Sequence, residues 1–252
     1  MKVLVAVKQV AILGDEVEFT EDDRDVDPDY LDYALNENEW DSYATEEALR
    51  LVEAAGSGEV VVISVGDEDA EDSMRRCLAM GADRGIRVES VRTLDPIQVA
   101  RALAEVVRSE SPDLVFAGVQ SSDSVQAATG GALAGLLDMP LVAVVTKIEL
   151  GDGKATVNRE LEGGLVDVVE VDTPAVITIQ TGINEPRYAT LRAIKQAEDK
   201  EIDVRQPGDL GPQAQRVRRM FVPPKGEGAE MLDGGAAEVA QRIKELVEEK
   251  MA

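Results

Sequence analysis

Two neighbouring stretches hold the residues best suited to chemistry: GVQSSDS (118–124) and TGGALAG (129–135). The first offers serine hydroxyls and an aspartate for hydrogen bonding, and it overlaps the end of the apolar run DLVFAGV (113–119). The second has glycines where a helix could begin, and free backbone N–H groups at a helix start can hold a phosphate. Ligands of open α/β sheets bind beyond the carboxyl ends of strands, so this position favours a nucleotide. The alternative is that the glycines only let a helix pack closely on a sheet, since the chain has neither a P-loop nor a G-x-G-x-x-G motif.

The composition argues against several classes of catalysis and binding. The chain has no histidine, which removes a Ser-His-Asp triad and the commonest metal ligand. Cys77 is the only cysteine, so neither an intramolecular disulfide nor a cysteine-based zinc or iron–sulfur site can form, and we expect a small buried apolar residue. With 50 acidic and 26 basic residues, the net charge of −24 would be repelled by nucleic acids and by anionic membranes.

The distribution of the acidic residues along the chain indicates the cellular environment of the protein. Acidic residues occur along the whole chain, which favours a halophilic, high-salt cytoplasm where screening weakens the repulsion between exposed carboxylates. An acidic surface made for one partner is the alternative. The start MKVLVAVKQV (1–10) does not read as a signal peptide, and no apolar run reaches transmembrane length. We therefore expect a cytoplasmic protein without stable membrane insertion.

Strand-like and helix-like runs alternate through the first part of the chain and would position these residues. Short apolar, often β-branched runs predict buried strands at 2–7, 59–66, 84–89, 113–119, 141–150 and 174–180. Helical spacing predicts helices at 41–55, 70–82, 95–113 and 125–140. The third has Asp95 as a candidate N-cap and Pro96 at its first position. The alternation predicts a doubly wound α/β fold with a mainly parallel sheet, a Rossmann variant like that of adenine nucleotide hydrolases.

The other segments predict additions to this sheet. An acidic loop should join the first strand to the first helix, and residues 154–172 read as two strands around a Gly163–Gly164 turn. From about residue 199 the chain looks extended and poor in core residues, until an amphipathic helix at 236–252. We expect a nucleotide-binding domain at 1–198 and an arm at 199–252 that packs on another subunit or on its own domain.

Several stretches resemble the β subunit of electron transfer flavoproteins. NEPRYATL (184–191) and LAMGADRGI (78–86) are the most specific, and the resemblance covers most of residues 1–211. The others are VAVKQV (5–10), ATEEALRL (44–51), PIQVARALA (96–104), PDLVFAG (112–118), VNRELEGGL (157–165), PAVITIQTGI (174–183) and PGDLG (207–211).

This resemblance implies an electron-carrier subunit, not an enzyme. In this family the α subunit holds the redox-active FAD, and the β subunit clamps it and commonly carries a structural AMP. The pair moves electrons from flavin dehydrogenases, such as acyl-CoA dehydrogenases, to a quinone reductase. For this chain we expect an α-subunit partner, FAD held mainly by that partner, AMP in the chain itself, and neither catalytic residues nor a metal.

The resemblance also implies a nucleotide site. Ala6 matches a backbone contact on the first strand, and Val65 matches a position near the adenine. The segment of Asn38, Glu39, Trp40 and Asp41 matches a short cofactor-binding motif, within which Trp40 matches an aromatic that approaches the α-bound flavin. The phosphate loop is matched by Ser121, Ser122, Asp123, Ser124, Val125, Gln126, Ala127, Ala128, Thr129 and Gly130. The alternative is a plain strand–helix connection over these ten residues.

Two further features match surfaces for partners. Tyr188, Leu191 and Ile194 fall in the loop that docks dehydrogenases in this family; Leu191 matches its apolar anchor, and we expect Tyr188 to pack inward beneath it. The alternative is an ordinary amphipathic helix with Leu191, Ile194 and Ala197 on one face. Glu160 matches an acid that pairs with the flavin domain of the α subunit, or else it is a solvated hairpin carboxylate.

Two other functions stay open. Electron-bifurcating relatives carry a second FAD in the β subunit and an Asp-Gly-Asp-Thr-Gly/Ala-Gln pattern in the phosphate loop. Asp123 is kept here, but the second acid, the threonine and the glutamine of the pattern are replaced, which argues against bifurcation. A stand-alone nucleotide-binding module of the stress-protein type would leave NEPRYATL and the arm without a purpose.

Overall fold

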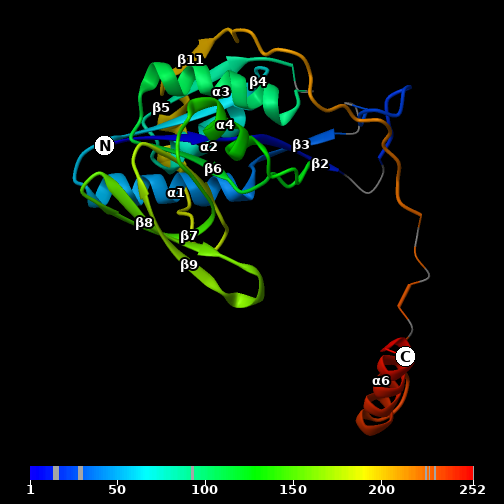
Figure 1. Cartoon of the computed structure of the whole chain (residues 1–252). Helices are drawn as coiled ribbons and strands as arrows, with labels where there is room; N and C mark the ends of the chain where they lie inside the picture. The colour runs from blue at the N-terminus through cyan, green and yellow to red at the C-terminus, as the bar shows by residue number, and fades with distance from the viewer. Residues whose placement is uncertain are drawn as a thin grey trace.

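The computed structural model describes residues 1–13, 17–27, 31–91, 94–224, 226, 228–229 and 231–251. Its centre is a nine-stranded sheet with the order β11-β5-β4-β1-β6-β10-β7-β8-β9 (Figure 1). The strands are β1 (Lys2–Ala6), β4 (Glu59–Gly66), β5 (Arg84–Glu89), β6 (Leu114–Gly118), β7 (Leu141–Gly151), β8 (Lys154–Glu160), β9 (Val166–Asp172), β10 (Ala175–Ile179) and β11 (Ile202–Arg205). Pairing is parallel from β11 across to β7, while β7–β8 and β8–β9 are antiparallel. The predicted α/β fold with a mainly parallel sheet is confirmed.

Helices cover both faces of this sheet. The helices are α1 (Glu39–Ala54), α2 (Ala70–Met80), α3 (Pro96–Glu110), α4 (Thr129–Leu137), α5 (Leu191–Glu198) and α6 (Ala236–Met251), of which α6 lies apart from the sheet. Alternate residues of β1 point to opposite faces, so Val3 and Val5 pack in one buried cluster with residues of α1 and α2. Leu4 packs in the other cluster with residues of α3 and α4. Cys77 is fully buried in the first cluster, as expected.

Local sequence signals set some helix ends and miss others. Asp95 caps α3 as predicted: Oδ1 accepts from the backbone N–H groups of Ile97 and Gln98 at 2.8 and 2.9 Å, and Pro96 is the first helical residue. Helix α1 begins at Glu39 instead of the predicted residue 41. Helix α4 begins at Thr129, so the predicted start at residue 125 is wrong.

Two strand pairings lie where the sequence predicted a loop or an extended arm. β2 (Gln9–Leu13) pairs antiparallel with β3 (Leu31–Glu37), in the span we expected to be an acidic loop. β11 pairs parallel with β5 at the sheet edge, with Ile202 opposite Gly85. Both pairings come from contacts distant in sequence, which outweigh weak local strand signals.

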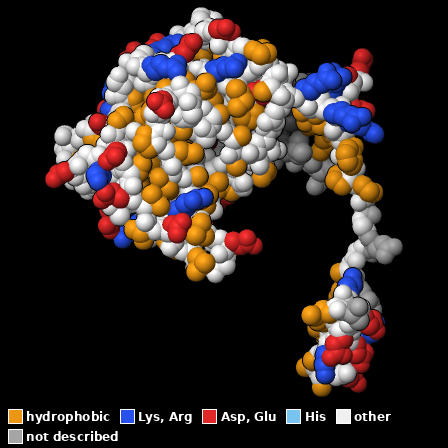
Figure 2. Space-filling model, viewed as in Figure 1, with side chains coloured by type: hydrophobic (Ala, Val, Ile, Leu, Met, Phe, Trp, Pro, Cys, Tyr) orange, Lys and Arg blue, Asp and Glu red, His pale blue; other side chains and the backbone are white. Residues whose placement is uncertain are grey.

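After β11, the C-terminal segment first contacts the α/β domain and then extends away from it. The backbone N–H groups of Ala214 and Gln215 donate to Asp95 Oδ2, so the same aspartate caps α3 and holds the arm. The predicted terminal helix is confirmed as α6, which stands apart from the sheet (Figure 1). Its side chains Ile243, Val247 and Met251 are exposed, and hydrophobic groups show along it in Figure 2. Among the described residues, no helix has the length and apolar character needed to span a membrane.

Candidate functional site

The carboxyl ends of β1 and β6 mark the point where the chain changes direction in the sheet. From β1 the chain builds β4 and then β5 on one side, and it returns to place β6 and β10 on the other. The crevice outside such a switch point is where open α/β sheets bind ligands. Lys8 follows β1, and the stretch from Gly118 to Ser124 starts at the last residue of β6. We call this place the switch-point site.

Asp41 joins the ends of these two strands. Its Oδ2 accepts from the backbone N–H of Lys8 at 2.8 Å, and its Oδ1 accepts from that of Gly118 at 3.1 Å. Burial raises the pKa of Asp41 to about 7, against the lowering effect of those two donors, of Asn38 and of the Lys8 charge. The site therefore holds a carboxyl that changes ionisation near neutral pH.

Asn38 holds the next stretch of the same loop. Its Nδ2 donates to the carbonyl of Gln120 at 2.6 Å, and its Oδ1 accepts from the backbone N–H of Ser122 at 3.1 Å. Asn38 is itself buried. The start of α1 thus fixes the path of the chain after β6 through two side chains, Asn38 and Asp41.

Gly118 is required by the closeness of α1 to β6. A Cβ at this position would lie 2.6 Å from Asp41 Oδ1 and 2.6 Å from the Cβ of Trp40. Gly130 is likewise a packing residue, because a Cβ there would lie 2.5 Å from Thr178 Cγ2. Gly130 therefore has the close packing that the alternative describes, and its contact with a phosphate stays a prediction.

Lys8 places a cation in the switch-point site. Its Nζ lies 2.6 and 2.7 Å from the two carboxylate oxygens of Asp123 and donates to Ser121 Oγ at 3.2 Å. Burial acts to raise the pKa of Asp123, but the Lys8 charge and its hydrogen bond leave that pKa below the usual range. Sequence reasoning gave Lys8 no role; a lysine directly after a buried strand was the available signal.

The loop before α4 has unusual backbone geometry. Val125 and Ala127 have φ of 51° and 49°, in the left-handed region that a β-branched residue rarely adopts. Ala128 then returns to right-handed geometry, and α4 has no side-chain cap. Such left-to-right alternation exposes backbone N–H groups in anion-binding concavities, and strained loops of this kind cluster at functional sites.

The predicted nucleotide residues gather at this one edge of the sheet. Ala6 ends β1, and Val65 is the penultimate residue of β4, the strand beside it. Asn38 and Asp41 contact the loop directly, whereas Glu39 is exposed. The phosphate-loop residues Ser121 to Gly130 run from the end of β6 into the first turn of α4.

Trp40 points towards β10 and not into the phosphate loop. Its Nε1 donates to Gln180 Oε1 at 2.9 Å. Gln180 Nε2 in turn lies 3.5 Å from Glu160 Oε2, at the end of β8. Through these contacts, Trp40 and Glu160 lie on opposite sides of the Gln180 side chain. The sequence alone did not identify Gln180 as a site residue.

Residues 184–198, which we call the docking segment, are held on α1 by partly buried polar contacts. Arg187 Nε lies 2.7 Å from Glu46 Oε2, and Glu46 is only 2% exposed. Asn184 Nδ2 donates to the carbonyl of Tyr43 at 3.0 Å and to Glu47 Oε2 at 2.9 Å. The turn is therefore a fixed attachment on α1.

The apolar side chains of the docking segment face solvent. Tyr188 is 97% exposed, so its predicted inward packing is wrong; Arg187 and Asn184 hold the turn in its place. Leu191 is 84% exposed and Ile194 45%, while Ala197 is 1% exposed. Leu191 does begin a helix, α5, as the alternative states, but Leu191 and Ala197 differ in exposure and so do not share one face of it.

The fold and this edge define a doubly wound α/β protein with its polar site at the switch point. Residues 33–210 match the family model of the electron transfer flavoprotein domain. The chain is 47% identical over 263 residues to the electron transfer flavoprotein subunit beta of Methylophilus methylotrophus, a match that covers 99% of this chain and 98% of that protein. It is 40% identical over 215 residues to the human electron transfer flavoprotein subunit beta, covering 84% and 83%. The chain belongs to the electron transfer flavoprotein β-subunit family.

Proposed function

We propose that this chain forms a heterodimer with an electron transfer flavoprotein α subunit, clamps the FAD held by that subunit, and docks flavin dehydrogenases. The observation that carries this proposal is the double use of α1. Its start lines the switch-point site through Asn38 and Asp41, and its middle holds the docking segment through Glu46. One rigid helix therefore sets the distance between a cofactor edge and a partner surface.

The switch-point site fits AMP in its donor chemistry. Lys8 and the backbone N–H groups in the uncapped first turn of α4 suit a phosphate, and Ala6 and Val65 offer partly buried apolar contacts for an adenine. Asp123 already pairs with Lys8, so most of the attraction for a phosphate would come from the backbone. When FAD is bound by the α subunit it supplies the redox chemistry, and this chain contributes Trp40 and Glu160 to its surroundings.

The docking segment fits a transient partner. An exposed leucine held on a fixed turn can act as the anchor of a small interface, with Tyr188 and Ile194 around it. We propose acyl-CoA dehydrogenases and similar flavoenzymes as donors and a quinone reductase as the acceptor. We also propose a cytoplasmic, high-salt setting, which the excess of 50 acidic over 26 basic residues supports.

The first experiment counts nucleotides in the complex purified with its α subunit in high salt. After denaturation, one FAD and one AMP per heterodimer would support the proposal. Two FAD and no AMP would indicate a bifurcating protein, and FAD alone would show that the switch-point site holds no nucleotide. Failure to isolate a flavin-containing complex would contradict the proposed function.

A second experiment tests the docking segment. Leu191→Ala should slow electron transfer from an acyl-CoA dehydrogenase to the complex, mainly through weaker binding, because truncating an interface anchor typically weakens affinity by about tenfold or more. Leu150→Ala, at an exposed leucine on β7, is the matched control and should leave that rate unchanged. Equal rates for the two variants would contradict the docking role.

A further inference from the structure

Gln180 occupies a fixed position directly after β10. Its backbone N–H donates to the carbonyl of Val145 at 3.0 Å, which ties it to β7. Its side-chain Oε1 accepts from Trp40 Nε1 at 2.9 Å and from the backbone N–H of Thr181 at 3.0 Å. Two hydrogen bonds therefore hold the side chain of Gln180, and a third holds its backbone.

The chemistry of these groups determines which way the Gln180 amide points. An indole N–H and a backbone N–H can only donate, so the amide oxygen must face Trp40 and Thr181. The NH₂ group must then face the other way, where it lies 3.5 Å from Glu160 Oε2. This contact is long and weak, but it gives the row of groups from indole to carboxyl one direction.

We propose that Gln180 is a positioning residue that fixes the indole of Trp40 and orients Glu160 on β8, linking the two across the sheet. The purpose of this link depends on the proposed function, because Trp40 and Glu160 are the residues that we place beside the α subunit. Its geometry does not depend on that function. The amide of Gln180 sets where the indole lies, and its NH₂ group faces the carboxyl of Glu160 on the side that a partner would approach.

The position of Gln180 in the chain extends this role to the docking segment. Only Thr181, Gly182 and Ile183 separate it from Asn184, which is itself bound to α1 through Tyr43 and Glu47. Trp40, Tyr43 and Glu47 lie along one helix. The segment from Gln180 to Asn184 therefore runs beside α1 with a polar attachment at each end, and Gln180 is the attachment nearest the switch-point site.

The chain offers a direct reporter, because Trp40 is its only tryptophan. We would measure the emission maximum and acrylamide quenching of Trp40 in the full chain, with circular dichroism to confirm folding. Gln180→Met removes the polar side-chain contacts with Trp40, Thr181 and Glu160. Losing one such hydrogen bond should lower the ratio of molecules with a fixed Trp40 indole to molecules with a mobile one about fivefold. The change should appear as stronger acrylamide quenching and a shifted emission maximum. Unchanged Trp40 emission and quenching in a folded Gln180→Met chain would overturn the proposal.

A second variant separates the two sides of the amide. Gln180→Glu keeps an acceptor for Trp40 but sets a second carboxyl against Glu160, so like-charge repulsion should move the Trp40 emission and quenching away from their wild-type values. Adding Glu160→Gln should then restore the wild-type signal. If the double variant behaves like Gln180→Glu alone, the link to Glu160 is wrong.

Gln241 provides a matched control. Its Nε2 donates to Glu245 Oε1 at 3.0 Å on α6, away from Trp40. Gln241→Glu makes the same change of charge against a neighbouring carboxylate and should leave the Trp40 signal unchanged. An equal response of Trp40 to Gln241→Glu would mean that net charge causes the effect, which would overturn the proposal. Because these readings need neither flavin nor α subunit, they remain valid if the heterodimer fails to form.

Discussion

Arg187 and Glu46 form a two-point ion pair that joins the docking segment to α1. Arg187 Nε and Nη2 lie 2.7 and 3.2 Å from the two carboxylate oxygens of Glu46. Glu46 also accepts from Arg50 at 2.6 Å, and its pKa is lowered because these arginines outweigh the opposing effect of burial. Arg187 continues to Glu53 at 2.7 Å. These ion pairs hold the turn on α1, so that the apolar side chains of the docking segment stay exposed to solvent.

Arg187→Gln should destabilise the protein and weaken docking together. It leaves Glu46 buried with one cation instead of two, and we expect a loss of about 1–3 kcal/mol in the free energy of unfolding. Denaturant unfolding measures the loss, and dehydrogenase-driven reduction of the complex measures docking. Arg192→Gln removes the same charge from an exposed arginine on α5 and is the control for stability. Adding Glu46→Gln to Arg187→Gln should recover part of the stability; no recovery would show that the pair is not what holds the turn.

Gly118→Ala should displace the start of α1. The new methyl group would lie 2.6 Å from both Asp41 Oδ1 and Trp40 Cβ, so backbone or side chains must shift. Overpacking of this kind costs about 1–3 kcal/mol of stability. Thermal unfolding measures the cost, and a change in Trp40 emission would show that the shift reaches the switch-point site.

Gly135→Ala is the matched control for that variant. It lies in α4 with open space around its Cβ position, and alanine favours a helix by about 0.5–1 kcal/mol over glycine. It should therefore leave stability unchanged or raise it. Equal stability of the two variants would contradict the packing argument for Gly118.

Much of the fold was predictable from local signals. Continuous β-branched runs such as KVLVA and EVVVISVG identify strands buried on both faces, and Asp95 with Pro96 marks the start of α3. β2, β3 and β11 were not predictable in this way, because distant partners determine their pairing. The start of α4 was missed because Val125 adopts a positive φ that its residue type disfavours.

The site was predicted as a set of stretches but not as a set of contacts. The family resemblance indicated Asn38, Asp41 and Asp123, and the structure brings all three to one edge. Lys8 and Gln180 gain their roles only when strands distant in sequence become neighbours: Lys8 and Asp123 lie 115 positions apart in the sequence, and Trp40 and Gln180 lie 140 positions apart. Tyr188 was predicted to be buried but is exposed, because residue type alone does not show whether an aromatic side chain is buried.

Stability should rise with salt concentration. A net charge of −24 repels itself in the folded state, and at molar salt the screening length falls to about 3 Å. We expect a higher free energy of unfolding in molar salt than in dilute buffer. Replacing the exposed Asp67, Glu68 and Asp69 by their amides should make this dependence shallower, and replacing Arg192 and Lys195 by glutamine should make it steeper. A chain equally stable in both conditions would contradict the high-salt setting.

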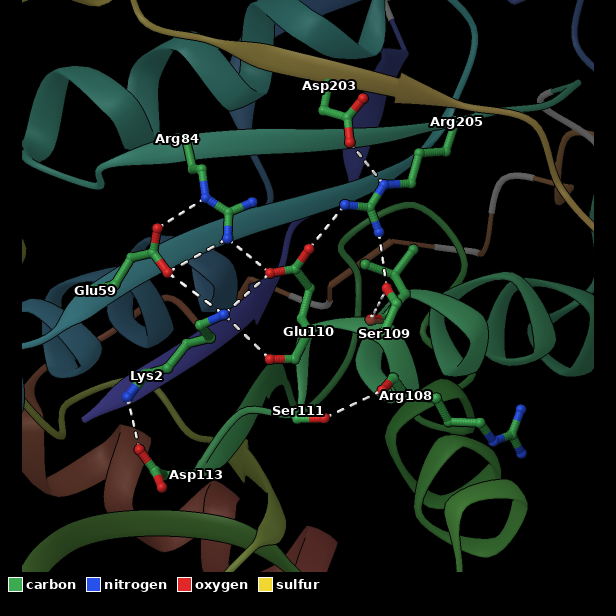
Figure 3. Close-up of polar contacts among 11 residues, drawn as sticks. Lys2, Glu59, Arg84, Arg108, Ser109, Glu110, Ser111, Asp113, Asp203 and Arg205 are labelled. Atoms are coloured by element: carbon green, nitrogen blue, oxygen red, sulfur yellow. Dashed lines mark hydrogen bonds and ion pairs between the residues drawn. The ribbon is translucent and has the colours of Figure 1, made fainter.

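Glu110 should control part of the acid sensitivity of the fold. It ends α3 and meets three cations: Arg84 Nη2 at 2.7 Å, Arg205 Nη2 at 2.8 Å and Lys2 Nζ at 3.2 Å (Figure 3). Burial acts to raise the pKa of Glu110, but these partners lower it to about 2. The side chain is only 11% exposed, so solvent screens the pairs little.

Because the folded-state pKa of Glu110 lies below its ordinary value of 4.5, the stabilisation is complete above that value. It is lost as the pH falls from about 4.5 through about 2, since the unfolded chain binds the proton first. Glu110→Gln should therefore lose up to about 3 kcal/mol at neutral pH and show a shallower fall in the free energy of unfolding below pH 4.5. Glu68→Gln removes the same charge from an exposed loop and should keep the wild-type slope. Denaturant unfolding across this pH range compares them, and a wild-type slope in Glu110→Gln would show that other carboxylates carry the acid sensitivity.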